Sequence, residues 1–315
     1  MLNRRLIRIK IFQAIYAHLQ SDNSSLQQSV NYLNKSLTGI QSTFNALVAF
    51  PFDLSHYVEL NQNPVDKYVT SEESEKQFKL FTNNIILRTL SLNPEVKETI
   101  ESPSYNWFKD NDFLNLIYKK IINHDDFKAF LGQDITTFEV QKAFLVWLNH
   151  FLLEESEDFD NKMEELEMHW IDEKYALQHS VKKLYQSIET EASINNLVIP
   201  VISKDLGEDL EFAKDLLRVC ILNAKEYEEL IAQKTPGWDK ERIAKPDIML
   251  MFMALGEFLE FPNIPVKATL NEYLELAKIY STPQSSKFLN GILDKLLKDL
   301  TAEKRILKKG RGLVG

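Results

Sequence analysis

The apolar residues of this chain recur mostly at three- and four-residue spacing, which is the period of one face of an α-helix. Phe78, Phe81 and Ile85 show this spacing, and so do Phe144 and Leu148. Glycine is scarce, with nine in 315 residues. The β-branched cluster from Leu197 to Ile202 could form a short strand, but Pro200 makes an extended linker an equal alternative. The sequence therefore predicts an all-α fold.

The first predicted helix, Leu2 to Gln20, carries a stripe that changes from cationic to apolar. Arg4, Arg8, Phe12, Ile15 and Leu19 follow one another at spacings of four, four, three and four. This pattern favours a helix whose second half packs into a bundle while its first half projects arginines. Projecting guanidinium groups can pair with phosphates or stack on unpaired bases. The alternative is an ordinary surface helix that begins with solvated arginines.

Helix boundaries near the C-terminus are marked by local signals. Thr269 and Glu272 have the spacing of a capping box, and Thr282-Pro283 offers an N-cap followed by proline at the first helical position. The sequence therefore predicts a helix from Pro283 to about Leu300. Gly291 inside this helix lowers its propensity, which indicates close approach of a neighbouring helix.

Lys287 and Phe288 lie on the first turns of that same predicted helix. An ammonium group and an aromatic ring at this place could face a phosphate and a base. On spacing alone, the pattern favours a core position for Phe288.

The formal net charge of −9 conceals a segregation of charge. Residues 1–20 carry a net charge of +4 and residues 301–315 also carry +4, which leaves −17 on the 280 residues between them. Local basic patches attract a polyanion, whereas an acidic body repels one. Composition alone is also typical of a disordered, solubilising C-terminal tail.

Other classes of function find little support. The single cysteine, Cys220, has no partner for an internal disulfide or a metal site, and no stretch has the form of a signal peptide, so we expect a cytoplasmic protein. Residues 154–167 hold eight acids and one lysine, a run typical of a solvated helix face. No nucleophile–base pair, phosphate loop or metal-ligand cluster is apparent, so we expect no catalysis and no cofactor.

Three segments resemble the transcription antitermination factor NusB family. They read RRLIRIKIFQAIY near the N-terminus, FAKDLLRVCILNAKEYEELI after residue 210, and VKATLNEYLELAKIYSTPQSSKFLNGILDK after residue 265. The resemblance covers residues 1–20 and about 205–300, and the last segment is the most diagnostic.

The resemblance implies a pair of helical bundles without enzymatic activity. It implies binding of boxA-type single-stranded RNA in ribosomal RNA transcripts together with the small-subunit ribosomal protein NusE, within the RNA polymerase antitermination complex. Family members occur as monomers or dimers, so a homodimer stays open. The resemblance assigns RNA-binding roles to eight residues, which are Arg4, Arg5, Arg8, Gln13, Tyr16, Asp247, Lys287 and Phe288.

This chain departs from the family pattern in its length. We predict a first helix with the arginine-rich motif at 1–22, an inserted all-helical region at 23–204, the remainder of the NusB-like domain at 205–300, and a basic tail at 301–315. The insertion expands the N-terminal bundle. The arginine cluster is also thinner than the family pattern, since Leu6 and Ile7 interrupt it.

Two other functions compete with RNA binding. The fold also occurs as a domain of ribosomal RNA cytosine methyltransferases, but that activity needs a Rossmann-like domain and a catalytic cysteine, which this sequence does not show. The closer alternative is a protein-interaction module that has lost RNA binding and docks a partner through the acidic insertion.

Overall fold

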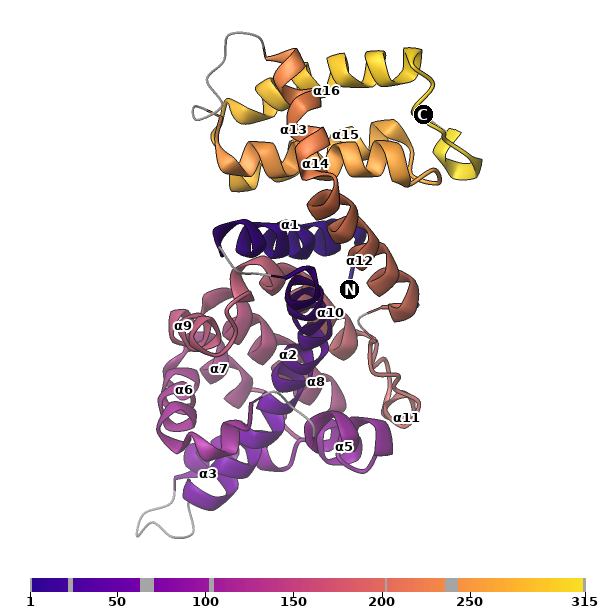
Figure 1. Cartoon of the computed structure of the whole chain (residues 1–315). Helices are drawn as coiled ribbons and strands as arrows, with labels where there is room; N and C mark the ends of the chain where they lie inside the picture. Colours follow the sequence, from indigo (N-terminus) through magenta and orange to yellow (C-terminus); the bar gives the residue numbers. More distant parts are fainter. Residues whose placement is uncertain are drawn as a thin grey trace. The chain divides into compact units, whose positions relative to one another are not determined.

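The computed structural model describes residues 2–21, 25–62, 71–101, 105–201, 203–235 and 243–313. These residues form helices and no strand, so the all-α prediction is confirmed (Figure 1). Residues 197–201 connect two helices without strand structure, and residue 202 lies outside the described residues. None of the described helices is both long enough and apolar enough to cross a membrane.

The chain divides into two compact units, which we call the terminal unit and the central unit. The terminal unit comprises residues 2–37 and 205–315, and the central unit comprises residues 38–204. Charge divides with them: the terminal unit has 22 basic and 19 acidic residues, a net +3, and the central unit has 15 and 27, a net −12. The central unit therefore repels a polyanion, whereas the net charge of the terminal unit does not.

The terminal unit is built around α14. The helices of this unit are α1 (Arg4–Gln20), the first part of α2 (Leu26–Asn61), α12 (Leu206–Leu222), α13 (Ala224–Lys234), α14 (Lys245–Glu260), α15 (Val266–Tyr280) and α16 (Ser285–Ala302), followed by a 3₁₀ turn at Gly310–Leu313. All residues of α14 from Met249 to Phe258 are buried. A helix that is apolar on all sides must be covered on all sides, and α1, α12, α13, α15 and α16 cover it.

Helix–helix contact in the terminal unit depends on one glycine. A Cβ at Gly256 of α14 would lie 3.2 Å from side-chain carbons of Leu216 and Val219 on α12. The close approach predicted at Gly291 is wrong, because a Cβ there would meet nothing within 4 Å. The absence of a side chain therefore allows close helix packing at Gly256 of α14 and not at Gly291 of α16.

The predicted caps of the last two helices are displaced by a turn or less. Since α15 begins at Val266, Thr269 lies inside it and cannot cap it. Since α16 begins at Ser285, Thr282-Pro283 precedes the helix instead of opening it, although the Thr282 and Ser285 hydroxyls are hydrogen-bonded at 2.8 Å. Tertiary partners outweigh the local capping signals here, since the Thr269 hydroxyl donates to the Glu257 carboxylate of α14.

The central unit is a helical array with an aromatic core. The rest of α2 leads into α3 (Glu72–Thr82), α4 (Ile85–Leu90), α5 (Pro94–Glu101), α6 (Asn111–Asn123), α7 (Asp125–Leu131), α8 (Phe138–His150), a π-helical turn at Phe151–Glu155, α9 (Glu157–Leu166), α10 (Trp170–Gln186) and α11 (Glu191–Ile194). Buried Trp107 stacks on Phe113 and Phe159, with ring centroids 5.7 and 5.5 Å away. Its indole N–H donates to the Ala46 carbonyl at 2.7 Å, so the polar atom of this core residue is satisfied.

Candidate RNA interface

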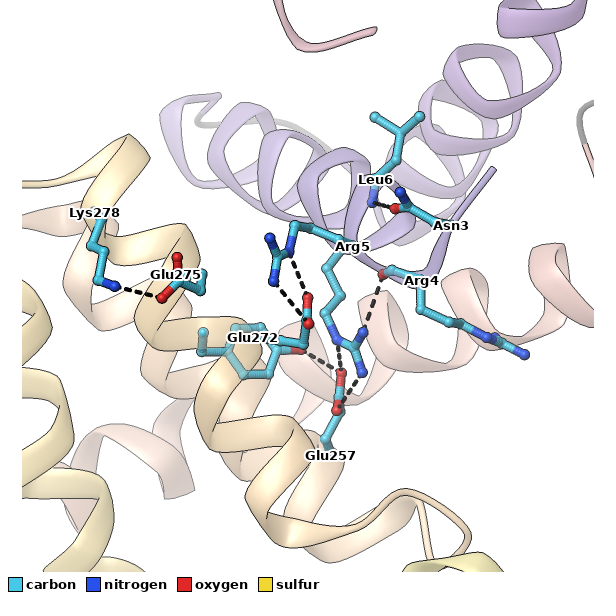
Figure 2. A network of polar contacts seen from close by, with 10 residues as sticks. Asn3, Arg4, Arg5, Leu6, Glu257, Glu272, Glu275 and Lys278 are labelled. Atoms are coloured by element: carbon cyan, nitrogen blue, oxygen red, sulfur yellow. Dashed lines mark hydrogen bonds and ion pairs between the residues drawn. The ribbon is translucent and has the colours of Figure 1, made fainter. Parts of the chain in front are cut away.

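The arginines predicted to bind RNA lie on the first two turns of α1. Asn3 caps this helix, because its side chain accepts a hydrogen bond from the Leu6 N–H at 2.8 Å (Figure 2). No acidic residue occupies the first turn. The N-terminal end of a helix dipole disfavours cations, so carboxylates from other helices must compensate these arginines.

Arg8 is held inside the terminal unit by Glu257 of α14. The Arg8 side chain is 4% exposed and that of Glu257 is 0% exposed. Two parallel bonds join them, from Nε to Oε1 at 2.6 Å and from Nη2 to Oε2 at 2.9 Å. The same carboxylate accepts hydrogen bonds from the Thr269 hydroxyl at 2.9 Å and the Tyr273 hydroxyl at 2.6 Å, so this buried charge is fully coordinated.

The electrostatics of this cluster stabilise the ion pair. Burial opposes the charge of Arg8, but the hydrogen bonds and negative charge of Glu257 outweigh it, and the pKa of Arg8 is raised. Burial and then the charge of Glu257 raise the pKa of Tyr273 well above its usual value. Arg8 is therefore a permanent internal cation, and Tyr273 is a neutral hydrogen-bond donor.

Arg5 and Arg4 remain at the surface, and each has a carboxylate partner. Arg5 bonds Glu272 of α15 through two nitrogens, at 2.9 and 3.1 Å, and the hydrogen bond to Glu272 raises the pKa of Arg5. Arg4 bonds Glu208 of α12 at 2.6 Å, and its guanidinium lies 4.6 Å from the ring centre of Phe212. Figure 2 shows Arg5 facing Glu272 and Arg4 directed away from both Glu257 and Glu272.

The predicted projection of arginines from α1 is therefore confirmed for Arg4 and Arg5 and wrong for Arg8. Of the four cations in this segment, Arg8 and Lys10 are buried, whereas the side chains of Arg4 and Arg5 are 41% and 45% exposed. The stripe from Arg8 to Phe12 and Ile15 enters the core as one continuous face. Only Arg4 and Arg5 are placed to meet a ligand without unfolding the helix.

The exposed arginines border an open groove of about 1220 Å³ in the terminal unit. The groove is formed by the start of α1, by α12, by residues 261–265 between α14 and α15, and by the C-terminal tail. Four arginines and four carboxylates line it, which are Arg4, Arg5, Arg8, Arg311, Glu208, Glu211, Asp215 and Glu272. Its lining is thus balanced in charge in the free protein.

The basic tail is folded, which corrects its interpretation as a disordered terminus. Lys308 donates to the carbonyls of Glu257 and Phe261, both at 2.9 Å, and thereby satisfies two acceptors at the C-terminal end of α14. The Lys309 N–H donates to the Pro262 carbonyl at 2.9 Å. These bonds bring Arg311 to the edge of the groove, exposed and with no ion pair among the described residues.

Gly312 allows this close approach, and replacing it tests the docked tail. A Cβ at this position would lie 2.0 Å from the Pro262 carbonyl oxygen, which is far inside van der Waals contact. We expect Gly312→Ala to detach residues 309–312, so that hydrogen exchange of their amides accelerates at least tenfold. Gly291→Ala, at a position with open space, is the matched control and should leave exchange in the tail unchanged. Equal tail exchange in the two variants would contradict the docked arrangement.

Two further predicted residues lie on the second half of α1. Gln13 is half-buried, and Tyr16 is 44% exposed. Phe12, one turn before Tyr16, contacts Tyr280 at the end of α15 with ring centroids 5.0 Å apart. The exposed ring of Tyr16 is thus anchored on a well-packed part of the helix.

The remaining predicted residues lie where α14 and α16 begin. Asp247 is buried and accepts a hydrogen bond from the Ser285 hydroxyl at 2.8 Å through Oδ2, while its Oδ1 has no hydrogen-bond partner. Lys287 is exposed and Phe288 is half-buried against the core. Asp247 and the first turn of α16 are thus joined through Ser285.

The acidic partners of the arginines were not predicted from the sequence. Glu257 lies 249 positions from Arg8, and Glu272 lies 267 positions from Arg5. One signal was available, because Glu257 is a carboxylate within the otherwise apolar Ile248 to Phe258 stretch, and a buried charge requires a partner.

Comparison with known proteins places the chain beside one family. The model of the NusB family matches residues 174–298. The transcription antitermination protein NusB of Salinibacter ruber (strain DSM 13855 / M31) is 36% identical over 143 residues, which is 44% of this chain and 89% of that protein. The protein of the same name from Koribacter versatilis (strain Ellin345) is 38% identical over 103 residues, 32% of this chain and 70% of that protein. No solved structure matches the chain.

Proposed function

The chain belongs to the NusB family, and from this premise we propose that it is a non-enzymatic RNA-binding factor of transcription antitermination. Its ligand is boxA-type single-stranded RNA of ribosomal RNA transcripts, bound together with NusE in the RNA polymerase antitermination complex. The observation that carries this proposal is the exposure of Arg4 and Arg5 at a groove of the terminal unit, which is the unit with net positive charge.

Arg4 and Arg5 can exchange their carboxylates for phosphates at little cost. Their pairs are exposed, and exposed ion pairs contribute about 0–1 kcal/mol each in water. A phosphate offers two oxygens to the planar guanidinium fork, and its neutralisation releases condensed counterions from the RNA. Arg311 adds a guanidinium to the same groove without having to leave a carboxylate.

The other predicted residues take distinct roles in this proposal. Tyr16 and Phe288 supply rings on which bases stack, and Lys287 supplies a further phosphate contact. Gln13 hydrogen-bonds base or ribose groups. Asp247 is buried and contributes by positioning the start of α16, which carries Lys287 and Phe288, through Ser285. Arg8 contributes by fixing the start of α1, because its guanidinium is fully used by Glu257.

The experiment that tests this function is a salt series of RNA binding by the wild-type chain. We expect a boxA-containing RNA to bind roughly tenfold more tightly than a scrambled RNA of equal composition, and NusE to strengthen only the boxA complex. The four phosphate contacts of Arg4, Arg5, Arg311 and Lys287 predict a log–log salt slope of about −3. Binding is measured by fluorescence anisotropy. Equal affinities for the two RNAs, with NusE present and absent, would refute the proposal.

A further inference from the structure

The central unit exposes large apolar side chains along one face of α10. Met168 is 79% exposed, Ile171 74% and Tyr175 85%. Ile171 and Tyr175 lie four residues apart on one face of α10, Met168 lies in the turn that precedes this helix, and we call these three side chains the stripe. The opposite face is the one that packs, since Trp170 and Leu177 are 1% and 3% exposed. The helix is therefore apolar on the side that no described residue covers, a feature that marks interaction sites.

This stripe continues into a groove. Gln178 and Lys182 follow Tyr175 at spacings of three and four, and both line a groove of about 610 Å³ between α8 and α10. Its apolar lining includes Val146 and Leu153. One wall is formed by the π-helical turn Phe151–Glu155, a rare element that often occurs at functional sites.

The groove also contains a hydrogen-bond donor without a partner. Trp147 lines it, and its indole N–H is buried and makes no hydrogen bond. Because unsatisfied buried donors are rare in folded proteins, this side chain is an unusual feature of the groove lining.

The surroundings of the stripe are strongly acidic. Residues 154–175 contain ten acids and two lysines. Both lysines are already paired within the unit, Lys162 with Asp110 at 2.8 Å and Lys174 with Asp160 at 2.6 Å. Glu164 and Glu165 are exposed on α9, a helix that contacts α10. A ligand that reaches the apolar side chains therefore meets a field of negative charge.

We infer that α10 and the adjoining groove form a docking site for a basic amphipathic segment of a partner protein. Apolar residues of that segment contact Met168, Ile171 and Tyr175, and its lysines or arginines face the acids of residues 154–175. RNA is repelled by this charge. A second copy of the chain would bring the same acids against themselves, which like-charge repulsion disfavours.

The test uses a labelled peptide of leucines and lysines in helical spacing, about 18 residues or five turns long, with a leucine–glutamate peptide of the same pattern for comparison. We expect the full-length chain to bind the lysine peptide selectively. Ile171→Ser/Tyr175→Ser should weaken this binding at least tenfold, and bound peptide should slow hydrogen exchange in residues 168–182. The matched control is Leu92→Ser/Val198→Ser, at positions of the same unit that are 82% and 74% exposed.

Three results would overturn the inference. The first is that the chain binds the lysine peptide no more tightly than the glutamate peptide. The second is that both double variants lose the same amount of peptide affinity. The third is that Ile171→Ser/Tyr175→Ser has a lower unfolding midpoint or sedimentation coefficient than the wild type in the absence of peptide. The last result would mean that the chain itself, or a second copy, covers the stripe. None of these outcomes depends on RNA binding.

Discussion

Replacing Arg8 with alanine is expected to lower the free energy of unfolding of the terminal unit by about 3–5 kcal/mol. The substitution leaves the Glu257 carboxylate buried with only the Thr269 and Tyr273 hydroxyls as partners. An unpaired buried charge costs far more than the ion pair contributes. Hydrogen exchange of α1 and α14 amides as a function of urea reports on this unit separately from the central one.

A double variant separates the unpaired charge from lost packing. Arg8→Met/Glu257→Gln removes both charges and keeps a long side chain at position 8. The new amide has an oxygen that can accept from one of the two hydroxyls and an NH2 group that can donate to the other. It should recover at least half of the loss. If Arg8→Ala cost less than about 1 kcal/mol, Arg8 would behave like an exposed pair, and its guanidinium would be available to RNA after all.

The sequence was sufficient for the helical class but not for the role of its arginines. Helical spacing is a local property and survives tertiary context, so the all-α prediction was reliable. The same spacing placed Arg8 in line with Phe12 and Ile15, which are core residues. An arginine on a core-facing stripe needs a buried acid, but no local pattern identifies a partner 249 positions away.

The predictions of the helix caps and of a disordered tail were wrong for a related reason. Thr269 has capping-box spacing, yet its hydroxyl donates to Glu257 from inside α15. The tail has the composition of a disordered segment, yet Lys308 completes the end of α14 and Gly312 fits against Pro262. In each case a tertiary contact with another segment determines the local structure, and local propensity does not encode such contacts.

The extent of the inserted region stays a prediction. The central unit begins at residue 38, whereas the family match begins at residue 174, within α10. Helix α2 contributes to both units, because Val30, Leu33 and Leu37 belong to the core around α14 while its later residues belong to the central unit. One continuous helix therefore carries the chain out of the terminal unit, and no loop marks the transition in the sequence.

Reversing the two exposed arginines, in Arg4→Glu/Arg5→Glu, should weaken binding of the boxA RNA about a hundredfold. Two charge-assisted phosphate contacts are lost, and two negative charges then face the RNA backbone. The neutral variant Arg4→Gln/Arg5→Gln should reduce the magnitude of the log–log salt slope by about 1.4, or 0.7 for each contact. Both are measured by anisotropy with and without NusE. The exposed ion pairs contribute little to stability, so the variants are expected to remain folded.

Two controls decide whether the arginines act locally. Arg218→Glu reverses one positive charge, as each substitution of the double variant does, but at an exposed site of α12 that does not line the groove. It should alter the affinity for RNA less than threefold. Glu272→Gln removes the carboxylate that holds Arg5, and it should strengthen RNA binding because Arg5 no longer has to exchange partners. Weaker binding in Glu272→Gln would mean that the ion pair positions Arg5 for the phosphate. If Arg218→Glu and the double reversal lowered the RNA affinity equally, α1 would contribute to RNA binding only through its net charge.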